Sequence, residues 1–342
     1  MGDYKFARDK LADVLSGLKE YQVFAPAVVG DVLRFKEVED PASVSLDYSN
    51  STVPPKELMF PQTETLFKYR LGQTDIEPTV PEGQRVVFGI RPCDAQAYSI
   101  VDNVFGWDFS DPYYQNRRRN TTLVGIACAD PCANCFCPSV GGGPASEEGL
   151  DALMFDLGDA YYVKTLTDKG EEFAKAAGLE AAGGAEAGAA QKQGEEALSK
   201  IERSIDTAGI PEKLPSLYDH PFWEQFSDRC LGCGICTFLC PTCHCFDIQD
   251  EAEAFDARRA RMWDTCMFSE YSLHTSGHNP RPTRKERTRN RISHKYSYFP
   301  EKFDVIACVG CGRCIKNCPV NIDILDILEK SRQAEAKEAK TA

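Results

Sequence analysis

Two cysteine motifs constrain the fold of this 342-residue chain more strongly than any other feature. Both have the pattern C-x2-C-x2-C-x3-C-P, with cysteines at 230, 233, 236 and 240 in the first and at 308, 311, 314 and 318 in the second. In such a pair, the first three cysteines of a motif hold one [4Fe–4S] cluster and the fourth ligates the other cluster. The spacing therefore predicts a first cluster on Cys230, Cys233, Cys236 and Cys318. It predicts a second cluster on Cys308, Cys311, Cys314 and Cys240.

Glycines flank these cysteines, at Gly232, Gly234, Gly310 and Gly312. Because glycine lets the backbone approach closely, these positions are expected to aim N–H groups at the cluster sulfurs. Pairs of C-x2-C also suit zinc, which is the alternative for both motifs. Two complete repeats, each closed by Cys-Pro, favour iron–sulfur clusters over zinc.

The 16 cysteines are grouped, with five between positions 93 and 137 and eleven between 230 and 318. A disulfide scaffold is typical of short secreted chains, and the first 21 residues lack the apolar segment of a secretory signal. No run approaches the roughly 20 apolar residues of a membrane-spanning helix. The formal charge of −13 disfavours nucleic acid as the main partner. We therefore expect a cytoplasmic protein without a membrane span, whose reduced thiols bind metal.

A further group of cysteines lies in the N-terminal half, after two short apolar runs. Arg85–Ile90 and Thr121–Ala127 have the length and composition of buried strands. Five cysteines follow these runs: Cys93, Cys128, Cys132, Cys135 and Cys137. This density is not typical of buried structural thiols. The spacing alone leaves a [4Fe–4S] cluster, a four-thiolate zinc site and a redox dithiol open.

The sequence divides into three parts. Residues 1–175 alternate strand-like and helix-like segments, with a hairpin over Leu153–Val163 that turns at Gly158-Asp159 and a helix that starts near Asp168. Residues 176–216 begin Ala/Gly-rich, which predicts a flexible linker or a loosely packed surface helix, and then become helical. Residues 217–342 hold both cysteine motifs, separated by an insertion at 241–307. The expected fold class is α+β, with a mixed α/β domain followed by a mainly helical, ferredoxin-like domain that binds two [4Fe–4S] clusters.

Several motifs resemble those of one protein family. They are FPQTE (residues 60–64), GIRPCD (89–94), the segment with CFC and GGGP (128–144), CPTCHCFD (240–247) and RMWDTCM (261–267). Together with the second cysteine motif they span most of the chain. The sequence thus resembles the family of iron–sulfur electron-transfer subunits that includes the sulfhydrogenase beta subunit, together with the corresponding iron–sulfur subunit of anaerobic sulfite reductase.

The resemblance implies a third [4Fe–4S] cluster on Cys93, Cys128, Cys135 and Cys137, with Cys132 as a neighbour or alternative ligand. About 12 Fe per chain are then expected, or about 8 if the N-terminal site holds zinc. The resemblance also implies a protein that relays electrons between a flavin-binding, NAD(P)H-linked subunit on one side and a catalytic subunit on the other. That catalytic subunit would be of the hydrogenase, sulfite reductase or heterodisulfide reductase type. No catalytic residue is assigned, since the sequence has no Rossmann fingerprint, P-loop or nucleophile–base motif.

Three cysteines remain outside these sets: Cys243, Cys245 and Cys266. The favoured interpretation is that they are buried structural thiols near the second cluster. The alternative is a redox dithiol or an extra ligand set with His244. These thiols keep open a different function, a stand-alone iron–sulfur reductase that acts on a small substrate at a cluster or at Cys243 and Cys245.

A basic stretch at residues 281–302 contains eight Lys or Arg residues in an otherwise acidic chain. A solvated face is the usual explanation of such a charge run. The alternatives are that it offsets the negative charge of thiolate-ligated clusters or that it docks an acidic partner subunit.

Overall fold

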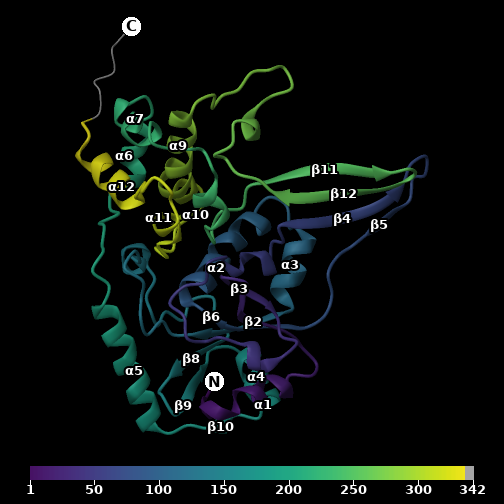
Figure 1. Ribbon diagram of the computed structural model, residues 1–342, viewed down its shortest axis with the longest axis vertical. Helices are drawn as coiled ribbons and strands as arrows, with labels where there is room; N and C mark the ends of the chain where they lie inside the picture. Colours follow the sequence, from purple (N-terminus) through teal and green to yellow (C-terminus); the bar gives the residue numbers. More distant parts are fainter. Residues whose placement is uncertain (336–342) are drawn as a thin grey trace.

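The computed structural model describes residues 1–335, and its N-terminal part is built on an eight-stranded sheet (Figure 1). The strand order is β10-β1-β9-β8-β7-β6-β2-β3. The four central strands β8, β7, β6 and β2 run parallel, and the strands outside them are antiparallel to their neighbours. The bounds are β1 (Asp3–Ala7), β2 (Gln22–Val29), β3 (Val32–Glu37), β6 (Arg85–Ile90), β7 (Thr121–Ile126), β8 (Ala152–Asp156), β9 (Ala160–Thr165) and β10 (Glu180–Ala181).

Helices cover both faces of this sheet, because its central parallel strands are apolar on both sides. On one face, Val87 and Leu123 share a core with α2 (Pro92–Gly106), α3 (Pro112–Arg119) and α5 (Gly184–Ser199). On the other face, Val86 and Val124 share a core with α1 (Leu11–Gly17) and α4 (Asp168–Ala176). Neighbouring residues of one strand, such as Val86 and Val87, thus face opposite cores, and both must be apolar. This explains why the strand sequences are continuously apolar.

Local signals in this part predict the structure well. β8 and β9 form the expected antiparallel hairpin, with Gly158 at φ +94°. α4 begins at Asp168 as expected, and the Thr167 side chain caps it by accepting a hydrogen bond from the Gly170 N–H. The Ala/Gly-rich segment contains the short strand β10 and the first part of α5, a helix that buries few of its residues.

The C-terminal part is mainly helical, so the α+β fold class is confirmed. Its helices surround a core that includes Trp223, Ile292 and Leu328. They are α6 (Ile210–Ser216), α7 (Glu224–Ser227), α8 (Ile235–Phe238), α9 (Arg284–Ser293), α10 (Phe299–Phe303), α11 (Arg313–Lys316) and α12 (Ile324–Gln333), with one π-helical turn at His294–Tyr298. No helix within residues 1–335 is long and apolar enough to cross a bilayer.

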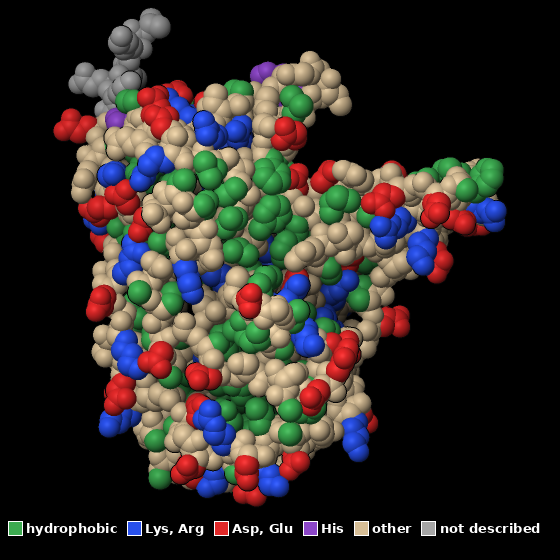
Figure 2. Space-filling view, viewed as in Figure 1, with side chains coloured by type: hydrophobic (Ala, Val, Ile, Leu, Met, Phe, Trp, Pro, Cys, Tyr) green, Lys and Arg blue, Asp and Glu red, His purple; other side chains and the backbone are tan. Residues whose placement is uncertain are grey.

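A second, four-stranded sheet projects from the body as an arm (Figure 1). Its order is β11-β12-β4-β5, with bounds β4 (Thr63–Arg70), β5 (Ile76–Pro78), β11 (Phe246–Glu253) and β12 (Asp256–Trp263). The hairpin β11–β12 belongs to the insertion between the cysteine motifs but pairs with β4 from the N-terminal part. Its tip exposes hydrophobic side chains, among them Leu71 and Phe255 (Figure 2).

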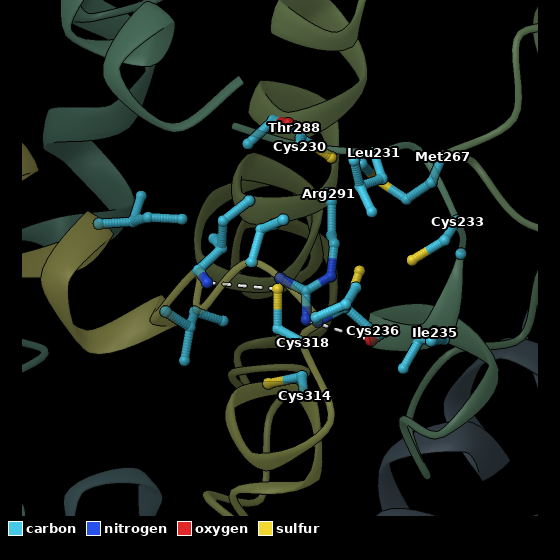
Figure 3. A pocket seen from close by; sticks show the side chains of 16 residues that line it. Cys230, Leu231, Cys233, Ile235, Cys236, Met267, Thr288, Arg291, Cys314 and Cys318 are labelled. Carbon is cyan, nitrogen blue, oxygen red and sulfur yellow. Dashed lines mark hydrogen bonds between the residues drawn. The ribbon is translucent and has the colours of Figure 1, made fainter. Parts of the chain in front are cut away.

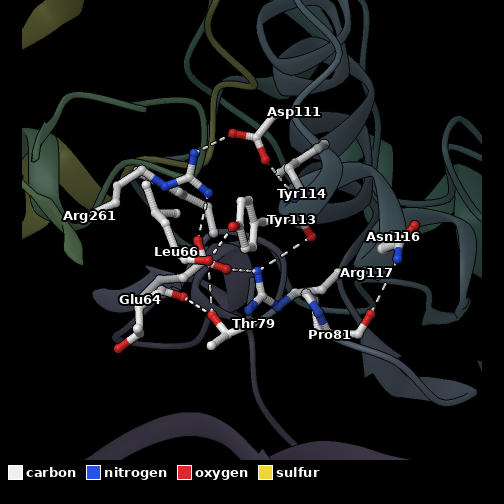
Figure 4. Close-up of polar contacts among 12 residues, drawn as sticks. Glu64, Leu66, Thr79, Pro81, Asp111, Tyr113, Tyr114, Asn116, Arg117 and Arg261 are labelled. Atoms are coloured by element: carbon white, nitrogen blue, oxygen red, sulfur yellow. Dashed lines mark hydrogen bonds and ion pairs between the residues drawn. The ribbon is translucent and has the colours of Figure 1, made fainter. Parts of the chain in front are cut away.

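A buried polar network fixes the base of this arm (Figure 4). Arg261 on β12 is only 3% exposed and lies 2.6 Å from Glu64 on β4 and 2.5 Å from Asp111 at the start of α3. Arg117 on α3 pairs with the same Glu64. Because each charge has partners of opposite sign, the network holds the arm against the N-terminal part without an unpaired buried charge.

Candidate iron–sulfur sites

The four cysteines predicted for the first cluster line one cavity of about 580 Å³ (Figure 3). Cys230, Cys233 and Cys236 come from the loop before α8 and from α8 itself, and Cys318 comes from the end of the second motif. The rest of the lining is mainly apolar and includes Met267. Cys314 is a fifth thiol of this lining. The four predicted ligands in a mostly apolar cavity match the donor chemistry of a [4Fe–4S] cluster.

Backbone geometry around the first site directs N–H groups at sulfur. Gly232 and Gly234 have φ values of +72° and +75°, a region that favours glycine. The Gly232 N–H donates to Cys230 Sγ at 3.3 Å, and the Ile322 N–H donates to Cys318 Sγ at 3.2 Å. Hydrogen bonds to ligand sulfurs of this kind tune the reduction potential of a cluster.

The cysteines predicted for the second cluster lie close enough to one another for their charges to interact. Burial raises the pKa of Cys314 to about 12, and the thiolates of Cys308 and Cys240 contribute to the shift. Burial likewise raises the pKa of Cys311, with Cys240 again among the charges that act on it. Thiols with such raised pKa values become thiolates when iron replaces the proton.

Two buried cations stand beside these thiols. Lys295 donates to Cys240 Sγ at 3.2 Å, to Thr242 Oγ1 at 2.8 Å and to the Ala307 carbonyl at 3.0 Å. Burial alone would lower the pKa of Lys295, but the thiolates of Cys240, Cys243 and Cys308 outweigh burial and raise the pKa above its ordinary value. Arg291 lines the first cavity and donates to the Cys236 carbonyl at 3.2 Å.

The basic stretch of the sequence is therefore not simply a solvated face. Arg287, Arg289, Arg291 and Lys295 are all buried. Burial of unpaired cations is costly, so anionic groups must compensate them. The position of Arg291 and Lys295 beside the cysteines favours the alternative that this stretch offsets cluster charge.

The four N-terminal cysteines implied by the family resemblance also surround one cavity, of about 340 Å³. Cys93 lies at the start of α2, after β6, and Cys128 follows β7, so both stand at the carboxyl edge of parallel strands. Cys135 and Cys137 lie on the loop beyond β7 and complete the thiol set. Cys132 is not part of this lining, but its Sγ is 2.8 Å from the Sγ of Cys135.

Two of the predicted cluster-flanking glycines also have a packing role that the sequence did not reveal. The Phe136 N–H donates to the Gly310 carbonyl at 2.8 Å. A Cβ atom on Gly310 would lie 2.5 Å from the Cys137 nitrogen, and one on Gly312 would lie 2.6 Å from the Asn134 carbonyl oxygen. Glycine therefore allows the second cysteine motif to pack directly on the N-terminal cysteine loop.

Sequence reasoning also missed Lys56, Asp94 and Arg313. Lys56 is buried, donates to the Cys243 carbonyl at 3.0 Å and lies over the Trp263 ring at 4.1 Å. Asp94 and Arg313 form a buried ion pair. Asp94 belongs to the GIRPCD motif and Arg313 to the second cysteine motif, but only the folded chain brings these distant positions together.

Within residues 1–335, no three or more His, Cys, Asp or Glu side chains are placed so that they could share one metal ion. The first predicted set and the N-terminal set each line a cavity instead.

Comparisons with known proteins agree with this geometry. Residues 229–322 match the family model of the 4Fe-4S dicluster domain, which implies two [4Fe–4S] clusters. Over 333 residues, the chain is 33% identical to the sulfhydrogenase 2 subunit beta of Pyrococcus furiosus, covering 96% of this chain and 98% of that protein. No solved structure matches the chain. The chain belongs to the family of sulfhydrogenase beta subunits.

Proposed function

We propose that the chain is the electron-relay component of a multi-subunit hydrogenase-type complex. In this proposal it holds three [4Fe–4S] clusters, on the two cysteine motifs and on the N-terminal set of Cys93, Cys128, Cys135 and Cys137. A bound [4Fe–4S] cluster takes up and releases one electron at a time. The partners are a flavin-binding, NAD(P)H-linked subunit on one side and a catalytic subunit on the other, which fits the name of the relative as one subunit of a sulfhydrogenase.

The observation that carries the proposal is the continuity of the three thiol sets. Cys311 and Cys314 both belong to the set predicted for the second cluster. Cys311 also lines the N-terminal cavity, and Cys314 also lines the cavity of the first cluster. The three sets therefore form a row, with the second set in the middle.

The solvent exposure of the cysteines changes along this row in a way that suits an electron relay. Cys308, Cys311 and Cys240 of the middle set are buried. At the end of the row, Cys233 is exposed, and its neighbour Leu231 is 61% exposed in the lining of the same cavity. A shielded centre and an accessible end let a partner protein approach the row without opening the middle site to solvent.

The chain's own charges support the same role. Lys295 lies beside the middle set, and Arg291 lines the first cavity. Fixed cations of this kind stabilise thiolate ligands and the extra negative charge of a reduced site. We propose that Lys295 and Arg291 tune the reduction potentials of the clusters, and that the cysteines bind the clusters.

Partial reactions of the assembled complex test this function. Cys314→Ser should damage the middle site while the partner subunits stay intact, with the complex of Lys192→Met, an exposed position on α5, as the control. We expect dye-linked hydrogenase activity and NAD(P)H-dependent dye reduction to persist, while electron transfer between the two substrates falls at least tenfold. Coupled activity at the parent level would contradict the relay. Reduction of a small substrate by the isolated chain at the rate of the complex would favour a stand-alone reductase instead.

A further inference from the structure

A fourth group of thiols surrounds a cavity outside the three sets described above. Cys243, Cys245 and Cys266 all line this one cavity. Two imidazoles, His244 and His294, complete the donor groups of its lining. None of these five residues belongs to the ligand sets of the proposed relay.

The arm positions these thiols. Cys245 lies directly before β11, and Cys266 lies shortly after β12. The Asp264 N–H donates to the Cys245 carbonyl at 3.0 Å, which extends the hairpin pairing to its base. Cys243 follows the first cysteine motif by only a few residues. The base of a hairpin and the end of a cysteine motif thus converge on one cavity.

The tautomer of His244 is suited to metal ligation. Its Nδ1 lies 3.0 Å from the Thr242 carbonyl oxygen, and a carbonyl can only accept, so Nδ1 carries the proton. This leaves the Nε2 lone pair free in a residue that lines the cavity. A ligating histidine commonly donates its other N–H to a backbone carbonyl in this way.

Charge at the cavity favours an anionic cofactor. Lys295 and Arg291 both line it, and Lys295 also contacts Cys240 Sγ at 3.2 Å. Two fixed cations beside three thiols fit a thiolate-ligated iron–sulfur cluster, whose net negative charge they would compensate.

We propose that Cys243, Cys245 and Cys266 bind a fourth [4Fe–4S] cluster, with His244 Nε2 as the ligand of its fourth iron. Assembly is a ligand exchange onto a preformed cluster held by thiolates of a donor: three Fe–S(thiolate) bonds to this chain and one Fe–N bond form while the four iron bonds to the donor's thiolates break, and the three thiol protons pass to the departing thiolates. No electrons are exchanged in that step. The contact of Lys295 with Cys240 places this site beside the middle of the relay, at the base of the arm.

Iron and acid-labile sulfide, counted in the anaerobically purified full chain, test the proposal. The Cys245→Ser Cys266→Ser variant should lose about four Fe and four sulfide relative to the parent chain. Lys192→Met, at an exposed position on α5, serves as the control and should keep the parent content. Equal iron and sulfide in the double variant and the parent would overturn the proposal, as would a parent chain in which alkylation and mass spectrometry find a Cys245–Cys266 disulfide.

A second variant separates this site from the N-terminal one. Cys128→Ser Cys137→Ser should lose its own four Fe, and combining both pairs of substitutions should remove about eight Fe. If only one pair of substitutions removes iron, that pair identifies which of the two sites binds a cluster. The fourth cluster can therefore be disproved while the three-cluster relay stands. Circular dichroism of each variant checks that the fold is kept.

The midpoint potential of the cluster tests the histidine ligand separately from the thiols. Replacing an imidazole ligand by a thiolate lowers the reduction potential of a cluster. His244→Cys should therefore keep the parent iron content and move the EPR midpoint potential of one cluster downward. His278→Gln, at an exposed histidine outside this cavity, is the control and should leave all midpoint potentials in place. Unchanged potentials in His244→Cys would overturn the assignment of His244.

Discussion

Asp94 and Arg313 form a bidentate ion pair in the interior, with 2.6 Å between Oδ1 and Nη1 and 2.7 Å between Oδ2 and Nη2. Their side chains are 0% and 2% exposed. Asp94 directly follows Cys93, and Arg313 lies between Cys311 and Cys314. Burial alone would lower the pKa of Arg313, but the Asp94 and Cys311 charges raise it instead. One ion pair thus fixes the N-terminal thiol set against the middle of the proposed relay.

Breaking this pair should be costly. Asp94→Asn would leave the Arg313 charge buried with no carboxylate, and we expect a loss of about 3–5 kcal/mol in the free energy of unfolding. Anaerobic guanidinium denaturation provides the measurement. The surface pair Asp206–Arg332 is the control, and Asp206→Asn should cost less than about 1 kcal/mol. Equal effects of the two substitutions would contradict the role assigned to the buried pair.

Lys295→Met should lower the midpoint potential of the middle cluster. Without this cation beside Cys240, adding an electron to the site becomes less favourable, and each 1.4 kcal/mol of lost stabilisation lowers a one-electron potential by about 59 mV. EPR-monitored redox titration measures the shift. Lys192 is exposed on α5 and pairs with Glu196, so Lys192→Met should leave the potential unchanged. A potential that Lys295→Met does not move would show that this charge does not tune the site.

The N-terminal site should depend on Cys135 but not on its close neighbour Cys132. Cys135 lines the cavity with Cys93, Cys128 and Cys137, whereas Cys132 does not. We expect Cys135→Ser to lose about four Fe per chain and Cys132→Ser to keep the parent content. Iron and sulfide analysis of both variants measures this. Iron loss in Cys132→Ser but not in Cys135→Ser would make Cys132 the ligand in place of Cys135.

Gly310→Ala should disturb the packing of the second cysteine motif on the N-terminal cysteine loop. A Cβ atom there would lie 2.5 Å from the Cys137 backbone nitrogen, in addition to the strain of an alanine at φ +61°. Gly72 also has a positive φ, of +83°, but no atom within 4 Å of an added Cβ, so Gly72→Ala isolates the backbone strain. We expect Gly72→Ala to cost about 1–2 kcal/mol and Gly310→Ala to cost more, with iron lost from the N-terminal site. Similar stability and iron content in both variants would contradict the packing role of Gly310.

The sequence predicts elements whose signals are local. Arg85–Ile90 is buried along its whole length, so its apolar run identifies the strand directly. The Gly158 turn and the start of α4 likewise depend only on neighbouring residues. The first three cysteines of each C-x2-C-x2-C-x3-C-P motif belong to the same class, because their spacing within one loop is a geometric requirement of the cofactor.

Features that depend on distant contacts could not be predicted in this way. β11 is polar and exposed over most of its length, so no alternation marks it as a strand, and it exists through pairing with β12, which in turn pairs with β4. The buried cations of α9 look like a solvated charge run until the folded chain places thiols beside them. The Asp94–Arg313 pair joins residues 219 positions apart, and neither position alone indicates its partner.

The most direct test of the relay is EPR during stepwise anaerobic reduction of the intact chain, with iron and sulfide counted on the same sample. Three thiol sets in a row predict signals from at least three [4Fe–4S] clusters. Because the second set lies between the other two, its reduction should broaden the signals of both neighbours. Signals from two clusters only, or three signals that add without mutual broadening, would contradict the account.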